Sequence, residues 1–158
     1  MKPVLSLFLL ALLPAPPTEA APPDDIPIYA VSLVGSPYRL GGTSPDTGVD
    51  CSGFVGHVFR QTTGLQLPRD SRAISEATQP LAQDELQPGD LVFFNTLQRA
   101  FSHVGIYLGD DRFVHASSSR TGMVMVSSLK DRYWREHFDG ARRAAESVPI
   151  QSPDAASD

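Results

Sequence analysis

The order of apolar patterns along the chain constrains the fold more than any other feature of the sequence. The apolar residues within positions 54–59 fall at spacings that place them on one side of a helix. Beyond residue 88 the pattern changes to short apolar runs separated by glycine- and aspartate-containing turns. One or more helices followed by antiparallel strands predict an α+β domain, with N-terminal helices packed on an antiparallel β-sheet.

The individual helices and strands follow from these patterns and from the residues that bound them. Asp50 is predicted to cap a helix that ends near residues 62–64, where Gly64 allows a left-handed stop. A shorter helix is predicted over residues 71–78, a turn over 88–90, and a short helix or turn over 133–138. Strands are predicted over residues 91–95, 103–109, 112–117, 123–127 and 141–146, the last of them at the edge of the sheet.

Residues 1–20 have the anatomy of a secretory signal peptide. Lys2 gives a positive start, residues 4–13 form a nearly unbroken apolar run, and residues 18–20 offer a cleavage site. The run is too short for a permanent membrane-spanning helix, although a buried core strand or an N-terminal anchor would have a similar composition. We therefore expect an exported protein, periplasmic or secreted, with no stable membrane anchor after the signal peptide is removed.

The rest of the sequence divides into one domain between two polar segments. Residues 21–27 are a proline-rich, acidic linker, and residues 147–158 are expected to be a disordered tail because they contain almost no large apolar side chains. Residues 28–146 have the size of a single domain. The formal net charge of −5 and the isoelectric point near 5.2 argue against a general polyanion binder, so no nucleic-acid partner is expected.

Cys51 is the only cysteine in the chain, so it cannot form an internal disulfide. A single cysteine is often a small, buried hydrophobic residue, but in an oxidising compartment an idle exposed thiol is a liability. Cys51 follows a loop and begins the predicted helix, on the side that Val55 and Val58 continue. The helix dipole and unpaired N–H groups favour a thiolate there, and Gly53 lets another segment approach closely. These features favour a nucleophile.

A cysteine nucleophile needs a base within hydrogen-bond reach and a group that orients the base. His57 lies on the same helix as Cys51 but about 240° around it. His137 lies in a polar C-terminal segment. Both are interpreted as surface residues, which leaves His103 and His115 on the two strands of one predicted hairpin.

The turn of this hairpin decides whether His103 and His115 share a face of the sheet. A two-residue turn would place them on opposite faces. A three-residue turn over residues 109–111, in which Gly109 can adopt positive φ, pairs Gly105 with His115 and makes His103 its diagonal neighbour. Diagonal neighbours lie about 7–8 Å apart, close enough for two imidazoles to meet. We therefore predict Cys51 as nucleophile, His103 as base and His115 as the orienting residue.

Two other interpretations of these residues remain. A histidine in a strand is often a half-buried structural residue with its hydrogen bonds satisfied. Two such histidines in one hairpin, together with a lone cysteine, make this interpretation less attractive. One cysteine and two histidines could also be three zinc ligands. No pair of them has the local spacing of a metal site, and a cysteine at a helix start does not need a metal to ionise, so no metal is predicted.

At these residues the chain resembles the NlpC-type family of peptidoglycan endopeptidases. The segments PYRLGG, DCSGFV, LPR, PGDLVFF, SHVGIYLG and FVHASS stand in the order and spacing of that family, over about residues 28–146. The resemblance implies a papain-like α+β fold. It also implies that Cys51 and His103 are the catalytic pair and that His115 is the third polar residue of the site.

The resemblance further implies a set of residues around the substrate. Tyr38 corresponds to a tyrosine beside the cysteine that helps to define the substrate and oxyanion region, and Asp50, Ser52 and Ser102 correspond to residues that line the substrate pocket. Without the resemblance these four would be a loop aromatic, a helix cap, a first-turn hydroxyl and a hydroxyl at a strand start. Arg69 and Asp90 also match the family, and we expect them to be structural, as a surface ion pair that contributes little.

The resemblance implies hydrolysis of a peptide bond in a peptidoglycan stem peptide or cross-link, with no metal or organic cofactor. The expected partner is the peptidoglycan peptide itself, and we expect a monomer. Two alternatives stay open: a thiol amidase or acyltransferase acting on another exported substrate, and a non-catalytic wall-binding module.

Overall fold

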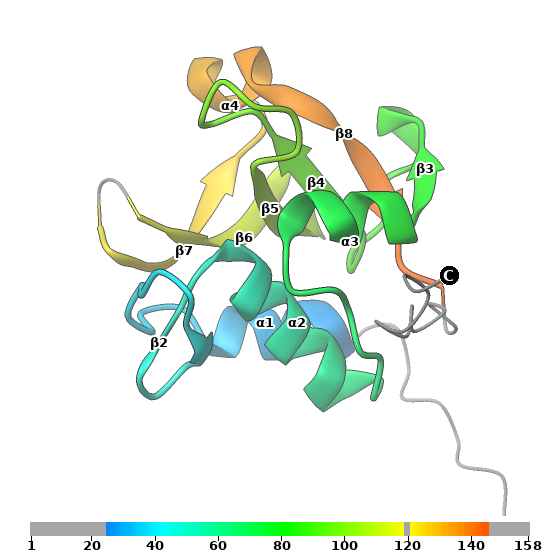
Figure 1. Cartoon of the computed structure of the whole chain (residues 1–158). Helices are drawn as coiled ribbons and strands as arrows, with labels where there is room; N and C mark the ends of the chain where they lie inside the picture. Colours follow the sequence, from blue (N-terminus) through cyan, green and yellow to red (C-terminus); the bar gives the residue numbers. More distant parts are fainter. Residues whose placement is uncertain (1–24, 119–120, 146–158) are drawn as a thin grey trace, which may run out of the picture.

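The computed structural model describes residues 25–118 and 121–145 of the chain (Figure 1). The predicted signal peptide, residues 1–20, and the predicted tail, residues 147–158, lie outside these ranges, as do residues 21–24 of the predicted linker. The last three linker residues belong to helix α1 (Asp25–Ser32), which buries Ile26 and Ala30. The linker prediction is therefore wrong for residues 25–27, because the apolar contacts of Ile26 hold them in the domain.

The helices begin and end close to where the sequence predicts. Asp50 caps α2 (Cys51–Thr62) by accepting a hydrogen bond from the Gly53 amide, and Gly64 beyond its end has a φ of 74°. The short helices predicted over residues 71–78 and 133–138 are confirmed as α3 (Ser71–Ala77) and α4 (Arg132–Glu136). Three further short elements are β1 (Thr43–Ser44), β2 (Gly48–Val49) and the 3-10 helix η1 (Gln83–Glu85).

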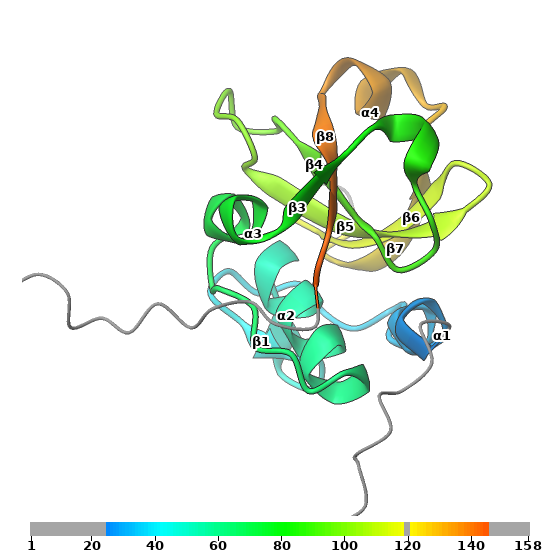
Figure 2. The ribbon, with the colours of Figure 1, turned by 90° about the vertical axis from the view of Figure 1, so that its right-hand side faces the viewer.

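One six-stranded antiparallel sheet organises the rest of the domain. Its strands, in spatial order, are β3 (Gln79–Leu81), β8 (Phe138–Arg143), β4 (Leu91–Phe94), β5 (His103–Gly109), β6 (Arg112–Ser117) and β7 (Met123–Ser128). Figures 1 and 2 show α1 and α2 together on one side of this sheet and α4 on the opposite side. The α+β prediction is confirmed.

The last strand is predicted to lie at the edge of the sheet. This prediction is wrong, because β8 lies between β3 and β4. Its basic sequence is typical of a solvent-facing edge, yet both arginines find partners inside the domain. Arg143 binds the buried carboxylate of Asp90, and Arg142 lies 5.0 Å from the centroid of the Phe101 ring. This edge of the sheet is formed by β3, which the sequence pattern does not predict because Leu81 is its single apolar residue beside a glutamine and a proline.

Alternating side chains of the sheet divide the interior into two apolar clusters. The cluster on the α2 side includes Phe54 and Val58 of the helix together with Val104 and Ile106 of β5. The cluster on the α4 side is built around Val92, Phe94, Phe113 and Leu129, with Trp134 packed against it. The predicted alternation of β5 is confirmed: Val104 and Ile106 belong to the cluster on the α2 side, whereas the His103 ring contacts Phe94 and Trp134 on the α4 side.

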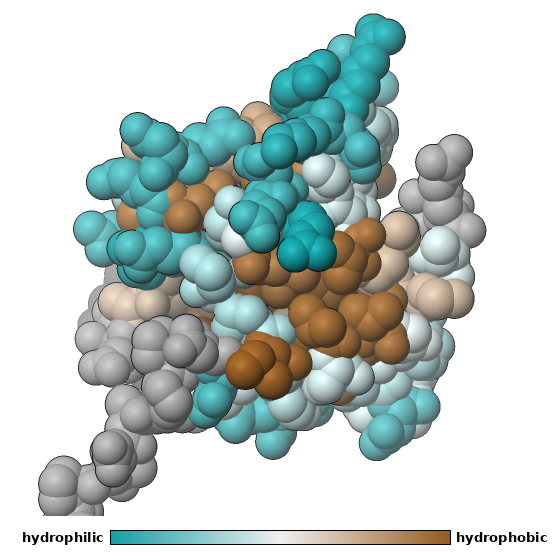
Figure 3. Space-filling model, turned by 180° about the vertical axis from the view of Figure 1, so that it is seen from behind, coloured by the Kyte–Doolittle hydropathy of each residue, from teal (hydrophilic) through white to brown (hydrophobic). Residues whose placement is uncertain are grey.

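The surface carries an apolar area that is visible from behind (Figure 3). Among the exposed large apolar side chains are Ile28 and Val31 on α1 and Met123 and Val126 on the edge strand β7. In the part of the chain that the structure describes, no helix has both the length and the apolar character needed to cross a membrane.

Candidate active site

The first residue of α2 is Cys51, and its side chain packs against the apolar cluster under the helix. Burial of the sulfur raises the pKa of the Cys51 thiol to about 11, and the neighbouring Asp50 carboxylate acts in the same direction. Hydrogen bonding from the backbone of Val104, Ser52 and Cys51 itself lowers this pKa, but by less. The expectation of a thiolate at the helix start is therefore wrong for the free protein: loss of water around the sulfur outweighs the helix terminus.

The contact with the Val104 backbone also places the thiol against strand β5, in which Val104 directly follows His103. The residue that the sequence predicts as the base thus begins the strand against which the sulfur lies. Cys51 and His103 come from segments that are far apart in the sequence, and helix α2, which Cys51 begins, packs against strand β5, which His103 begins.

The hairpin of β5 and β6 differs from its prediction in one respect. Its turn has two residues, Asp110 and Asp111, both with positive φ (50° and 58°), and not three. The register nevertheless pairs Tyr107 with Phe113, because it shifts at Leu108, where a β-bulge adds one residue to β5. The bulge supplies the odd offset that the sequence argument assigned to the turn.

As a result, His103 and His115 lie on the same face of the sheet, as predicted. Nε2 of His103 is 2.9 Å from Nδ1 of His115, and the two rings are nearly perpendicular. Gly105 makes room for this pair, since a Cβ at that position would lie 3.2 Å from the Cβ of His115 and 2.9 Å from the Val114 carbonyl oxygen. The two imidazoles therefore form a hydrogen-bonded unit.

The unit continues beyond the two histidines. Nε2 of His115 is 3.0 Å from Oγ of Ser127 on β7, so both nitrogens of the His115 ring are engaged. The zinc alternative requires a free nitrogen on His115, which this arrangement does not leave. Among the described residues, no three histidine, cysteine or acidic side chains gather as a set of metal ligands.

Trp134 of α4 covers the same two rings. Its indole is stacked on His103, with ring centroids 5.7 Å apart, and meets His115 edge-on at 4.8 Å. Burial lowers the pKa of His103 to about 4. Burial and the neighbouring His103 lower the pKa of His115 to about 3. Both imidazoles are therefore neutral at neutral pH, and a neutral imidazole can accept a proton.

Tyr38 lies beside Cys51, as the resemblance implies. Its backbone N–H donates to the Gly122 carbonyl at 2.6 Å, which ties the loop before α2 to the segment that leads into β7. Burial raises the pKa of the Tyr38 hydroxyl, and the negative charge that Cys51 carries when ionised and the charge of Asp50 act in the same direction. The hydroxyl remains a hydrogen-bond donor next to the thiol at neutral pH.

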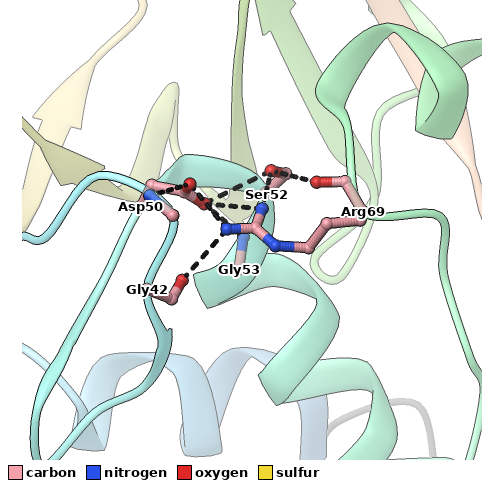
Figure 4. A network of polar contacts seen from close by, with 6 residues as sticks. Gly42, Asp50, Ser52, Gly53 and Arg69 are labelled. Carbon is pink, nitrogen blue, oxygen red and sulfur yellow. Dashed lines mark hydrogen bonds and ion pairs between the residues drawn. The ribbon is translucent and has the colours of Figure 1, made fainter.

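Asp50 and Ser52 belong to a polar network around Arg69 (Figure 4). The Arg69 guanidinium donates to both oxygens of Asp50, at 2.9 and 2.7 Å, and Ser52 donates to the Arg69 carbonyl at 2.7 Å. The same carboxylate accepts from the amides of Gly53 and Gly41. Burial alone would raise the pKa of Asp50, but Arg69 and the two amides outweigh it and hold the pKa below its usual value. The network fixes the loop that precedes the thiol.

The prediction of an ion pair between Arg69 and Asp90 is wrong. Arg69 binds Asp50, whereas Asp90 is buried at the start of β4 and accepts from Nε and Nη2 of Arg143 at 2.8 and 2.7 Å. The two arginines therefore connect different parts of the domain. Arg69 connects the loop after α2 to the start of that helix, and Arg143 connects β8 to the start of β4.

Ser102 lies next to His103, but its hydroxyl points to the backbone of the preceding loop. It accepts hydrogen bonds from the amides of Thr96 and Leu97 at 3.0 and 3.2 Å. The predicted surface histidines lie outside the site: His57 contacts the Tyr29 hydroxyl, and His137 ends α4.

Ser127 and Trp134 are the two residues of this site that the sequence argument misses. Trp134 is the only tryptophan in the chain, which is a signal by itself. It lies in a short polar helix whose position over the histidines depends on the path of the chain between β7 and β8. Ser127 is one of several serines, and only its pairing with Phe113 on β6 places it beside His115.

A helix that begins with the single thiol, packed on a sheet that carries two hydrogen-bonded histidines, defines an α+β domain with a thiol–imidazole site. The sequence model of the NlpC/P60 family matches residues 35–143, which include Tyr38, Cys51, His103 and His115. The chain belongs to the NlpC/P60 family.

Individual relatives agree with this assignment. The chain is 44% identical over 136 residues to the probable endopeptidase NlpC of Escherichia coli, covering 82% of this chain and 86% of that protein. It is 41% identical over 114 residues to murein DD-endopeptidase MepH of Escherichia coli, covering 70% of this chain and 41% of that protein. It is 38% identical over 133 residues to gamma-DL-glutamyl hydrolase of Bacillus subtilis, covering 82% and 32%. The chain thus spans less than half the length of the last two.

Solved structures of the same family share the fold. A solved NlpC/P60 family protein from Bacillus cereus superimposes with a TM-score of 0.71 at 32% sequence identity, covering 82% of this chain and 41% of that one. The α+β arrangement described above is therefore that of the NlpC/P60 domain.

Proposed function

We propose that this chain is a cysteine peptidase that hydrolyses peptide bonds in the stem peptides or cross-links of peptidoglycan. The observation that carries the proposal is the hydrogen-bonded pair of neutral imidazoles, His103 and His115, at the start of the strand that contacts the Cys51 sulfur. This is the arrangement that a thiol nucleophile needs: a base with a free nitrogen, held by a third group.

The first half of the reaction forms an acyl-enzyme. Nδ1 of His103 takes the proton from the Cys51 thiol as the sulfur attacks the carbonyl carbon of the substrate. The helix-start N–H of Cys51, aided by the Tyr38 hydroxyl, stabilises the oxyanion of the tetrahedral intermediate. The carbon–nitrogen bond then breaks, and the proton on His103 passes to the leaving amine.

The second half regenerates the thiol. His103 takes a proton from water as the water oxygen attacks the thioester carbon, the carbon–sulfur bond breaks, and the sulfur recovers the proton. Because the pKa of the thiol lies at about 11 and that of His103 at about 4, the resting pair is neutral, and proton transfer accompanies the attack. His103 therefore acts as a general base and then as a general acid.

The names of the relatives support a wall peptide as substrate and leave a choice of bond. MepH is a murein DD-endopeptidase, whereas the Bacillus subtilis relative is a gamma-DL-glutamyl hydrolase. Cleavage within a stem peptide at a γ-glutamyl bond is the second candidate, and the amines released by the two reactions differ. We further propose that residues 1–20 direct export and are removed, which N-terminal sequencing of the mature protein would test.

The test is digestion of purified peptidoglycan and defined muropeptides, with the new termini identified by mass spectrometry. We expect Cys51→Ala to abolish cleavage and His103→Gln to lower kcat by about a thousandfold or more, as removal of one member does in other nucleophile–base sites. His137→Gln, made in a histidine outside the site, should leave the rate unchanged. Equal cleavage by the Cys51→Ala protein would disprove Cys51 as the nucleophile, whereas no cleavage by the wild-type protein would favour a non-catalytic module.

A further inference from the structure

The hydrogen bond between His115 and Ser127 extends the site beyond the two histidines. Nε2 of His115 lies 3.0 Å from Oγ of Ser127, while Nδ1 of the same ring faces His103. His115 is 1% exposed, so neither nitrogen can exchange its partner for bulk water. The protons on these three side chains must therefore be arranged in a consistent order.

Only two neutral arrangements satisfy both hydrogen bonds. In the first, Nε2 of His103 carries a proton and donates it to Nδ1 of His115, and Nε2 of His115 donates to the Ser127 oxygen. In the second, every bond is reversed: Ser127 donates to Nε2 of His115, and Nδ1 of His115 donates to Nε2 of His103. Each neutral imidazole carries one N–H, so mixed arrangements would leave two donors or two acceptors facing each other.

The two arrangements differ in what His103 can do. In the first, Nδ1 of His103 is unprotonated and can take the thiol proton of Cys51. In the second, that nitrogen already carries a proton and cannot act as a base. Chemistry through Cys51 thus depends on the tautomer of a ring that does not touch the sulfur.

We infer that Ser127 is a positioning residue that keeps His115 in its Nε2–H tautomer by accepting the hydrogen bond from that nitrogen, and so keeps Nδ1 of His103 free to act as base. The inference rests on the proposed function for its kinetic consequence. Without the serine oxygen, the productive tautomer would carry a buried N–H with no acceptor, and orphaned buried donors are among the least tolerated groups in proteins.

Of the side chains that contact the His115 ring on this side, Ser127 is the one that can accept a hydrogen bond from its Nε2. Trp134 covers both histidine rings through its π-system, and Phe113, which pairs with Ser127 across the strands, lies 5.0 Å from the His115 ring. Neither side chain offers an oxygen to Nε2 of His115. When His103 accepts the thiol proton, the same chain of bonds lets His115 and Ser127 share in stabilising the imidazolium.

The tautomers can be measured without any substrate. In the full chain labelled with ¹⁵N-histidine at neutral pH, protonated and unprotonated ring nitrogens resonate far apart, so the spectrum reports the tautomer of His115. We expect Nε2–H in the wild-type protein and a mixture in Ser127→Ala. Alkylation of Cys51 by iodoacetamide should slow in Ser127→Ala, because a smaller fraction of His103 can act as base.

Kinetics then tests the consequence for turnover. We expect Ser127→Ala to lower kcat about 10- to 100-fold with KM unchanged, the range found when a functional imidazole elsewhere loses its outer hydrogen-bond partner. Ser127→Thr, which keeps the hydroxyl, should restore most of the rate. Ser128→Ala is the matched control, since Ser128 is the next residue of the strand and its hydroxyl accepts from the Lys130 amide and not from His115.

The outcomes separate the inference from the proposed function. If no peptidoglycan substrate is cleaved by the wild-type protein, the proposed function fails, while the ¹⁵N spectra and the alkylation rates still decide the role of Ser127. A wild-type His115 with its proton on Nδ1, or a Ser127→Ala protein that matches Ser128→Ala in spectrum, alkylation and kcat, would overturn the inference.

Discussion

Loss of water around Cys51, His103 and His115 decides their charge at neutral pH: His115 is buried, and Cys51 and His103 are partly buried. The pKa of the thiol lies at about 11, and those of the two imidazoles at about 4 and 3. The thiol and the imidazole are therefore both uncharged before the substrate binds, and they do not form an ion pair. In the proposed mechanism, charge therefore forms only during the attack, where the substrate and the helix-start amides can stabilise it.

Trp134 provides part of this burial, and its replacement should change the pH dependence of the enzyme. In the wild-type protein kcat/KM should fall only as pH approaches 4, where His103 becomes protonated. In Trp134→Leu, water reaches His103, its pKa rises toward 6.5, and the acidic limb of the profile should move to higher pH. The measurement is the pH profile of kcat/KM on a soluble muropeptide.

A suitable control for this prediction lies next to the tryptophan. Tyr133 is 48% exposed and contacts Trp134 and His137, so Tyr133→Leu should leave the acidic limb in place. If Trp134→Leu and Tyr133→Leu had the same profile as the wild-type protein, burial by the indole would not be what lowers the pKa of His103.

At the scale of the elements, two glycines of α2 meet very different surroundings. A Cβ at Gly53 would overlap the carbonyl oxygen of Gly42 and lie 3.0 Å from Oδ1 of Asp50, whereas a Cβ at Gly56 would have no heavy atom within 4 Å. The first turn of the helix is therefore in direct contact with the loop that leads into it. This contact sets the position of Cys51 relative to β5.

Alanine at these two positions should have opposite effects. Gly53→Ala must push the helix start away from Gly42, which we expect to cost about 1–3 kcal/mol of stability and to lower kcat, since the thiol moves with the helix. Gly56→Ala should stabilise the protein by about 0.5–1 kcal/mol, the ordinary gain in a helix, at unchanged kcat. Urea denaturation and muropeptide kinetics on both variants test this, and equal effects would refute the proposed contact.

At the scale of the whole molecule, the two histidines of the site should make the fold sensitive to acid. In the unfolded chain both would titrate near 6.5, but in the folded protein they remain neutral until about pH 4 and 3. Between these limits the unfolded state binds more protons, so this stabilisation is complete above pH 6.5 and is lost as pH falls toward the folded values. The lowered pKa of Asp50 acts in the same direction, below its unfolded value of 3.8.

Chemical denaturation at a series of pH values tests this dependence. The free energy of unfolding should decrease from pH 6.5 downward, by an amount on the order of a few kcal/mol over the full range. His115→Asn removes a group that can be protonated, so the free energy of unfolding should depend less on pH. His137→Asn, made outside the site, should leave this pH dependence unchanged. A wild-type stability that is constant between pH 6.5 and 4 would contradict the buried, neutral state of the two rings.

The α+β class, the limits of α2 and the choice of Cys51, His103 and His115 follow from the sequence alone, because caps, periodicity and alternation are local properties. The bulge at Leu108, the interior position of β8 and the separate partners of Arg69 and Asp90 depend on tertiary contacts. The positions of Ser127 beside His115 and of Trp134 over the His103 ring also depend on these contacts.

The physical reason is the same in each case. A bulge or a strand order depends on the free energy of contacts between segments far apart in the chain, and no short stretch of sequence contains both partners. The same holds for the charge of Cys51: its place at a helix start favours a thiolate, but the enclosure of the sulfur by the folded protein reverses that preference and raises its pKa to about 11.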